Sequence, residues 1–154
     1  MVDLSPNARH VSAVDGHKVR HPSGAFMNIK VFAHETNGAY SLMETVLPPG
    51  GVVPKHVHEH EDENNYILDG QLTMHIGDEV FTAKAGSFVV APKGVTQFFR
   101  NDGYEDCRFL TTFTPGGAEE YFREAGELIK STPNGRPSRE KLLALQEKYA
   151  LRYL

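Results

Sequence analysis

Hydrophobic positions in residues 10–113 recur in short runs that turn residues separate. Two of these runs, "SFVVAP" (Ser87–Pro92) and "CRFLTTF" (Cys107–Phe113), are rich in the β-branched and aromatic residues that favour strands. The other runs cover Met27–Ala33, Ala39–Leu47, Asn65–Asp69, Gln71–Ile76 and Glu79–Ala83. The "DG" at 69–70 lies between two of them and indicates a hairpin. Closely spaced strands with no helical pattern between them predict an antiparallel sandwich or barrel.

The pattern changes after "TPGG" (residues 114–117), where apolar residues recur at helical spacing. This stretch presents one apolar face, made of Tyr121, Phe122, Ala125, Leu128 and Ile129. Glutamates in its first turn and a lysine in its last suit the helix dipole. Ser138 is then expected to cap a second helix, whose apolar face consists of Leu142, Leu145 and Tyr149. We therefore predict one domain over residues 1–154, with a barrel at about 10–113 and two helices at about 117–150 that pack on it.

Composition narrows the classes of function and partner. The chain has 154 residues and a formal net charge of −4, which gives no reason to expect nucleic acid or an anionic membrane surface as a partner. It has no apolar stretch long enough to span a membrane, and its first residues lack a secretory signal pattern. A single cysteine, Cys107, excludes an internal disulfide and fits a reducing compartment. We therefore expect a soluble cytoplasmic protein that binds neither nucleic acid nor membranes.

The stretch "HVHEHEDE" (residues 56–63) combines three histidines at every second position with four carboxylates. Alternate residues of a strand point to the same face, so His56 and His58 are expected to project together. Imidazole and carboxylate ligands suit one divalent transition metal, namely Fe, Mn, Ni, Co, Cu or Zn, and Glu63 follows across a bend. The simpler alternative is that the histidines are polar strand residues facing solvent and that Glu63 is a surface charge.

The spacing of residues around this stretch resembles that of a known family. Five residues separate Gly50 from His56, four separate His58 from Glu63, and six separate Glu63 from Gly70, as in the first cupin motif. A later stretch matches the second cupin motif in its spacing, with Gly86, Pro92, Gly94, Gln97 and Asn101. The chain is thus similar to the cupin superfamily, and in particular to small single-domain cupins that resemble quercetin dioxygenases.

The resemblance implies an all-β fold, the double-stranded β-helix or jelly-roll barrel, followed by two C-terminal α-helices. It also implies a homodimer, and a metal ion in the barrel held by His56, His58, Glu63 and residue 97. Cupins of this type usually have a third histidine where this chain has Gln97. Three possibilities are therefore open: Gln97 binds the metal through its oxygen, the other three residues form a weaker site, or the metal is lost and the pocket is used otherwise.

The resemblance further implies a metal-dependent dioxygenase that acts on a small aromatic or enolic substrate, with dioxygen as the second substrate. In that hypothesis Glu63 binds the metal or acts as the general base. A second hypothesis is a non-redox isomerase, lyase or cyclase on the same scaffold, since Gln97 changes the ligand field. A third is a protein that binds a small ligand without turnover, because fold alone does not settle function.

The remaining candidate residues have simpler interpretations. His60 is expected to be a solvated loop histidine; the alternative is that it replaces the missing ligand or shuttles protons. Four expectations concern sets of residues. We expect a solvated charge cluster of Glu59, Glu61 and Asp62, and structural or turn roles for His75, Gly94, Asn101 and the core residue Cys107. Surface or strand-end positions are expected for His10, His17 and His21. Phe99 is expected to line the pocket, and either a lining role or a plain core role is expected for Phe109, Thr111 and Phe113.

Overall fold

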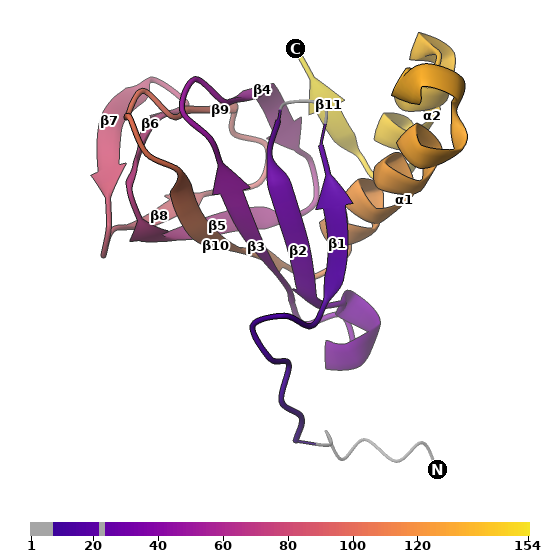
Figure 1. Cartoon of the computed structure of the whole chain (residues 1–154), viewed down its shortest axis with the longest axis horizontal. Helices are drawn as coiled ribbons and strands as arrows, with labels where there is room; N and C mark the ends of the chain where they lie inside the picture. Colours follow the sequence, from indigo (N-terminus) through magenta and orange to yellow (C-terminus); the bar gives the residue numbers. More distant parts are fainter. Residues whose placement is uncertain (1–7, 22–23) are drawn as a thin grey trace.

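The computed structural model describes residues 8–21 and 24–154, and strands dominate the centre of this part of the chain (Figure 1). The strands are β1 (His17–Arg20), β2 (Phe26–Val31), β3 (Ser41–Leu47), β4 (Val52–His58), β5 (Asp62–Asp69), β6 (Gln71–Ile76), β7 (Glu79–Lys84), β8 (Phe88–Ala91), β9 (Gln97–Arg100), β10 (Cys107–Thr114) and β11 (Leu151–Tyr153). A short 3-10 helix, η1 (Ala33–Thr36), follows β2, and η2 (Pro133–Gly135) lies between the two α-helices.

These strands form two antiparallel sheets that together make the predicted cupin barrel. One sheet has the order β1-β2-β3-β10-β5-β8 and the other has the order β11-β4-β9-β6-β7, so strands distant in sequence are neighbours. The hairpin predicted at 69–70 is confirmed, because β5 ends at Asp69, β6 starts at Gln71, and Gly70 between them has a positive φ of 78°.

The core lies between the sheets and follows the two-residue period of the strands. In β10, Cys107, Phe109, Thr111 and Phe113 are buried, whereas the residues between them are exposed or half-buried. The buried positions of β3 alternate in the same way. This alternation explains why the apolar runs of the sequence predict most strands to within about two residues.

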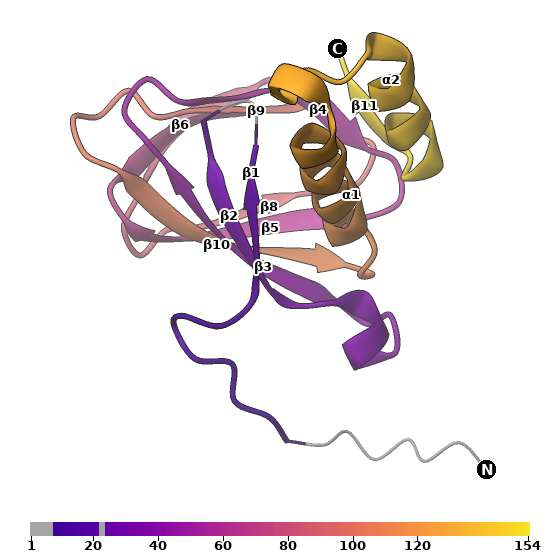
Figure 2. The same ribbon diagram turned by 45° about the vertical axis from the view of Figure 1, so that its right-hand side comes forward.

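Both predicted helices are present and lie at the same end of the barrel (Figures 1 and 2). Helix α1 (Ala118–Ser131) buries Tyr121, Phe122 and Ala125 against the barrel, and its Glu119 carboxylate accepts hydrogen bonds from the backbone N–H groups of residues 33 and 117. The Ser138 side chain accepts from the N–H of Lys141 and caps α2 (Arg139–Lys148), as predicted. Helix α2 itself buries no residue completely.

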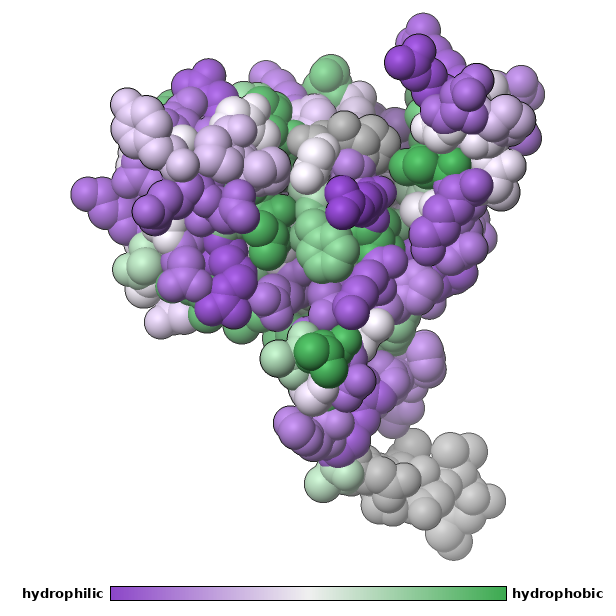
Figure 3. All heavy atoms as spheres, viewed as in Figure 1, coloured by the Kyte–Doolittle hydropathy of each residue, from purple (hydrophilic) through white to green (hydrophobic). Residues whose placement is uncertain are grey.

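A short strand that the sequence pattern did not indicate follows α2. Strand β11 returns to the barrel and pairs with β4, placing Leu151 opposite His58 and Tyr153 opposite His56. Hydrophilic residues dominate the face seen in Figure 3, where the apolar residues form separate small areas. Among the helices in the described part of the chain, none is long and apolar enough to cross a membrane.

Candidate metal centre

Three strands bring together the four residues that the sequence singled out. His56 and His58 lie on β4, Glu63 lies near the start of β5, and Gln97 begins β9. Gln97 stands directly opposite His56 in the pairing of β4 with β9. All four side chains are buried, with residue exposures of 3%, 1%, 5% and 1% in that order. The alternative of solvent-facing histidines and a surface glutamate is therefore wrong.

The two imidazoles and the carboxylate converge on one point. Oε2 of Glu63 lies 3.0 Å from Nε2 of His58 and 3.5 Å from Nε2 of His56. The candidate ligand atoms of these three residues all lie within 4.8 Å of one another. Two ligands bound about 2.1 Å from one ion at tetrahedral or right angles are roughly 3.0–3.4 Å apart, so these spacings fit a shared metal ion.

Hydrogen bonds from neighbouring groups hold two of these side chains in place. Nδ1 of His56 lies 2.7 Å from the carbonyl oxygen of Pro54, which leaves Nε2 to face the cluster. Nδ2 of Asn65 donates to Oε1 of Glu63 over 3.2 Å, and Oγ1 of Thr111 donates to the Asn65 side-chain oxygen over 2.7 Å. Such outer contacts orient the ligands of metal sites, and they leave Oε2 of Glu63 as the oxygen that faces the histidines.

Several polar atoms of the cluster are buried without a hydrogen bond to any described residue. They are Oε1 of Gln97 and both ring nitrogens of His58, whose Nε2 approaches Glu63 without hydrogen-bonding geometry. A buried polar group with no partner costs about 1–3 kcal/mol, so such groups are rare unless something else satisfies them. A divalent metal ion would satisfy all of these groups except Nδ1 of His58, and the donor set of two imidazoles, one carboxylate and one amide oxygen suits such an ion.

The charge state of Glu63 also suits a cation. Burial alone would raise the pKa of this carboxyl, but its contacts with His56 and His58 outweigh burial and hold the pKa well below its usual range. Glu63 is therefore ionised at neutral pH. A buried carboxylate between two imidazoles provides the negative charge that offsets a bound divalent metal.

An aromatic cavity adjoins the cluster and includes the residues that alternation predicted. It is lined by Phe99, Phe109, Thr111 and Phe113, together with His56 and Glu63. No pattern in the sequence indicated His21, Phe122 and Tyr153, which line the cavity from the two ends of the chain. The other described lining residues are Met27, Met43, Thr45 and Val53. The cavity is narrow, with a volume of only about 20 Å³.

The structure corrects one expectation about the acidic residues. Glu61, predicted to be solvated, is 8% exposed, and its Oε2 lies 3.9 Å from Nδ1 of His58. Burial raises the pKa of Glu61. The loop before β5 folds this side chain toward β4, and its Oε1 lies close to the backbone at Gly117. Glu59 remains exposed and pairs with Arg152, while Asp62 is half-buried and accepts from the N–H of Lys93.

The other secondary expectations hold, with one qualification. His60 and His10 are exposed, and His75 is a half-buried residue whose ring contacts Phe98 edge-on at 5.2 Å. Cys107 is fully buried, and burial raises the pKa of its thiol to about 11. Gly94 and Asn101 occupy turns, where Asn101 donates to the carbonyls of residues 47 and 105. His21 does follow the end of β1, but it is half-buried and lines the cavity.

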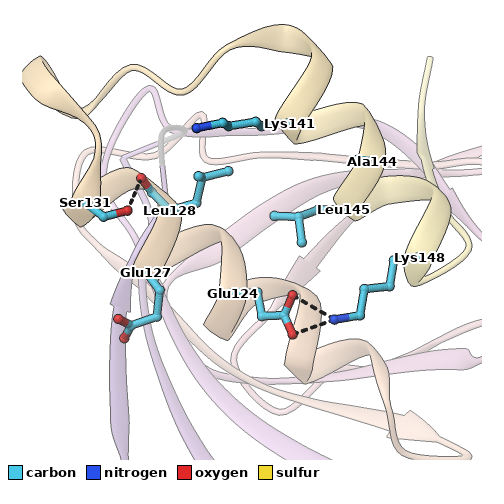
Figure 4. A pocket seen from close by; sticks show the side chains of 8 residues that line it. All are labelled: Glu124, Glu127, Leu128, Ser131, Lys141, Ala144, Leu145 and Lys148. Carbon is cyan, nitrogen blue, oxygen red and sulfur yellow. Dashed lines mark hydrogen bonds and ion pairs between the residues drawn. The ribbon is translucent and has the colours of Figure 1, made fainter.

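A separate hollow lies between the two helices and shares no residue with the cluster (Figure 4). Leu128 and Leu145 are its main apolar residues, and a salt bridge from Lys148 to Glu124 crosses one side of it. Because His56, His58, Glu63 and Gln97 are all absent from its lining, this hollow is not part of the candidate metal centre.

Comparison with known proteins relates this arrangement to other chains. Residues 43–113 match the family described as "Cupin domain". The chain is 27% identical over 92 residues to quercetin 2,3-dioxygenase of Bacillus subtilis (strain 168), which is 60% of this chain and only 27% of that protein. It is 22% identical over 156 residues to polyketide synthase CurC of Streptomyces cyaneus, covering 94% of this chain and 100% of that protein.

A solved structure supports the fold independently. The polyketide cyclase RemF from Streptomyces resistomycificus superposes with a TM-score of 0.61 at 22% sequence identity. The superposition covers 70% of this chain and 80% of the RemF chain. At this level of identity the similarity concerns the fold, which is the jelly-roll barrel described above.

Proposed function

Because this chain belongs to the cupin superfamily, we propose that it is a metal-dependent dioxygenase for a small aromatic or enolic substrate. The observation that supports this most is the buried convergence of His56, His58 and Glu63, with the unpaired oxygen of Gln97 beside them in the sheet. The partial likeness to quercetin 2,3-dioxygenase agrees with it, although this chain spans 27% of that protein.

The four residues His56, His58, Glu63 and Gln97 would hold the ion. When bound, a divalent transition metal acts as a Lewis acid and makes a hydroxyl of the substrate easier to deprotonate. Glu63 is ionised, and its Oε2, the oxygen that Asn65 does not bind, can accept that proton. The amide oxygen of Gln97 is a donor that Mn²⁺ accepts readily, so Mn²⁺ belongs among the first metals to test.

The cavity lining supports a flat substrate without negative charge. Phe99, Phe109 and Phe113 present aromatic surface beside Glu63, and the described residues that line this cavity include neither lysine nor arginine. Apart from the proposed metal ion, a carboxylate-bearing or phosphorylated substrate would meet no cationic side chain among the described lining residues to offset its charge. A neutral phenol or enol would bury apolar surface and present only its hydroxyl to the cluster.

Oxygen uptake in the presence of a flavonol tests the proposal. The purified chain is loaded separately with Mn, Fe, Co, Ni, Cu and Zn, and dissolved oxygen and flavonol absorbance are followed together. We expect both to fall with a redox-active metal, and Glu63→Gln to abolish the reaction. His60→Ala is the matched control, because His60 lies in the same stretch but is exposed, and it should leave the rate unchanged.

A second candidate function, a non-redox cyclase or related enzyme, rests on the match to CurC along 94% of this chain. It uses the same four residues and the same proton acceptor, without dioxygen. Conversion of a phenolic or polyketide substrate at an unchanged oxygen concentration would favour this function over the dioxygenase. Stoichiometric binding of such a compound without conversion, with any of the metals, would identify a binding protein instead.

A further inference from the structure

Tyr153 lies between the buried cavity and the outside of the protein. It lines the cavity that contains His56 and Glu63. It also lines an outer groove on helix α2, where the other lining residues are Pro137, Arg139, Leu142, Leu143 and Gln146. No other described residue lines both hollows.

The space beside the candidate ligands is too narrow for a substrate. The four candidate ligands are at most 5% exposed, and the space beside them is wide enough for little more than one water molecule. A substrate therefore reaches Oε2 of Glu63 only if a side chain in the cavity wall moves. The question is which side chain can move at the least cost.

The position of Tyr153 makes it the best candidate. It is the last residue of β11, a strand of three residues, and its ring lies 5.6 Å from the ring of His56. The backbone around it is fixed, because Leu151 is buried and the N–H of Leu154 donates to the carbonyl of Lys55 over 2.9 Å. Its ring also lies 6.2 Å from the ring of Tyr121 on α1, and its outer side faces α2, in which no residue is fully buried.

We propose that the Tyr153 side chain is the gate between the outer groove on α2 and the metal-site cavity, and that it limits the size of the substrates that enter. Rotation of the ring joins the two hollows while β11 stays paired with β4. The inference rests on the proposed function only in taking the inner cavity as the place where the substrate reacts. This route favours flat, apolar molecules, because both the groove and the cavity are lined mainly by apolar side chains.

Histidine modification measures this gate without requiring metal or turnover. The full chain, dialysed against a chelator, is treated with diethyl pyrocarbonate, and fragmentation mass spectrometry follows the modification of His56, with exposed His60 as the internal reference. We expect Tyr153→Ala to raise the rate at His56 relative to His60 by roughly tenfold, since a buried group reacts in proportion to the population of its open state. Tyr153→Phe keeps the ring and should react like the wild type.

Two further variants separate a gate from a loosened strand. Arg152→Ala removes the neighbouring side chain of β11, which pairs with Glu59 on the outer surface, and should leave the rate at His56 unchanged. Leu143→Trp enlarges an exposed residue of the groove and should slow the modification, which keeps the test readable if Tyr153→Ala does not fold.

If folded Tyr153→Ala is modified at His56 no faster than the wild type, Tyr153 is not the gate. Equal acceleration of this modification in Arg152→Ala would also contradict the proposal. An unchanged rate in Leu143→Trp would overturn the groove as the route. Because none of these readings needs a bound metal, failure of the dioxygenase proposal leaves the result intact.

Discussion

Substitution of Gln97 by methionine should have opposite effects on the metal-free and the metal-loaded protein. Gln97 is 1% exposed, and its Oε1 has no hydrogen-bond partner among the described residues. Methionine is close to glutamine in length and volume but does not bury an amide. If Gln97 serves to bind a metal, its buried amide should destabilise the folded protein when the metal is absent.

The size of the effect follows from the buried oxygen. An unpaired buried polar group costs about 1–3 kcal/mol, so metal-free Gln97→Met should gain roughly that free energy of unfolding. For a domain of this size each kcal/mol shifts the midpoint of thermal unfolding by about 2–4 °C, which gives a rise of roughly 2–12 °C. With Mn²⁺ present the wild type should be more stable than Gln97→Met. Each tenfold loss of Mn²⁺ affinity in the variant removes about 1.4 kcal/mol of the stability that the bound metal contributes.

The assay is thermal unfolding of both proteins in chelator and in a series of Mn²⁺ concentrations. Mn²⁺ is chosen because it binds carbonyl oxygen well and a thioether poorly, so methionine does not substitute as a ligand. Gln97→His, which supplies an imidazole, is the matched control and should bind late transition metals such as Ni²⁺ more tightly than the wild type. Identical Mn²⁺ affinities for the wild type and Gln97→Met would refute the assignment of Gln97 as a ligand.

Three further predictions concern the site and the core. The double variant His56→Ala with His58→Ala should lose metal, by elemental analysis, while its far-UV circular dichroism keeps the β-rich shape of the wild type. Burial, and secondarily His56, lower the pKa of His21 from 6.5 to about 4, so the unfolded chain takes up a proton before the folded one does as pH falls. His21 should therefore cost the wild type about 2 kcal/mol of stability between pH 6.5 and pH 5, a loss that His21→Asn should not show in urea unfolding with chelator present. Cys107, with its buried thiol and a pKa of about 11, should react with a thiol reagent only in denaturant, and rapid reaction in the folded protein would contradict its core position.

Local patterns in the sequence predicted an antiparallel sandwich or barrel and the shared face of His56 and His58, whereas the jelly-roll fold and the place of Gln97 beside them came from the resemblance to the cupin motifs. His56 and His58 are two residues apart on one strand, so alternation alone places them on the same face. The same rule links Gln97 to Phe99 on β9, and Phe109, Thr111 and Phe113 to one another on β10. These predictions succeed because each depends on one strand and one bend.

Residues that reach the site through long-range pairing could not be predicted in this way. Strand β11 is three residues long and follows a helix, so nothing local indicates that Tyr153 pairs with His56. The expectation for Glu61 was wrong for a related reason: its neighbours in sequence are charged, but the fold places it beside His58 of β4 and near Gly117 of a distant loop. His21 reaches the cavity from the other end of the chain.

The metal content of protein purified without added metal tests the central claim most directly. Elemental analysis should find about one divalent transition metal per chain, and anomalous scattering from crystals should place it between His56, His58 and Glu63, with Gln97 as the fourth ligand. Protein that lacks metal, and that gains no stability from any of the six candidate ions, would contradict the account. So would a metal ion bound elsewhere in the chain while this cluster stays free of it.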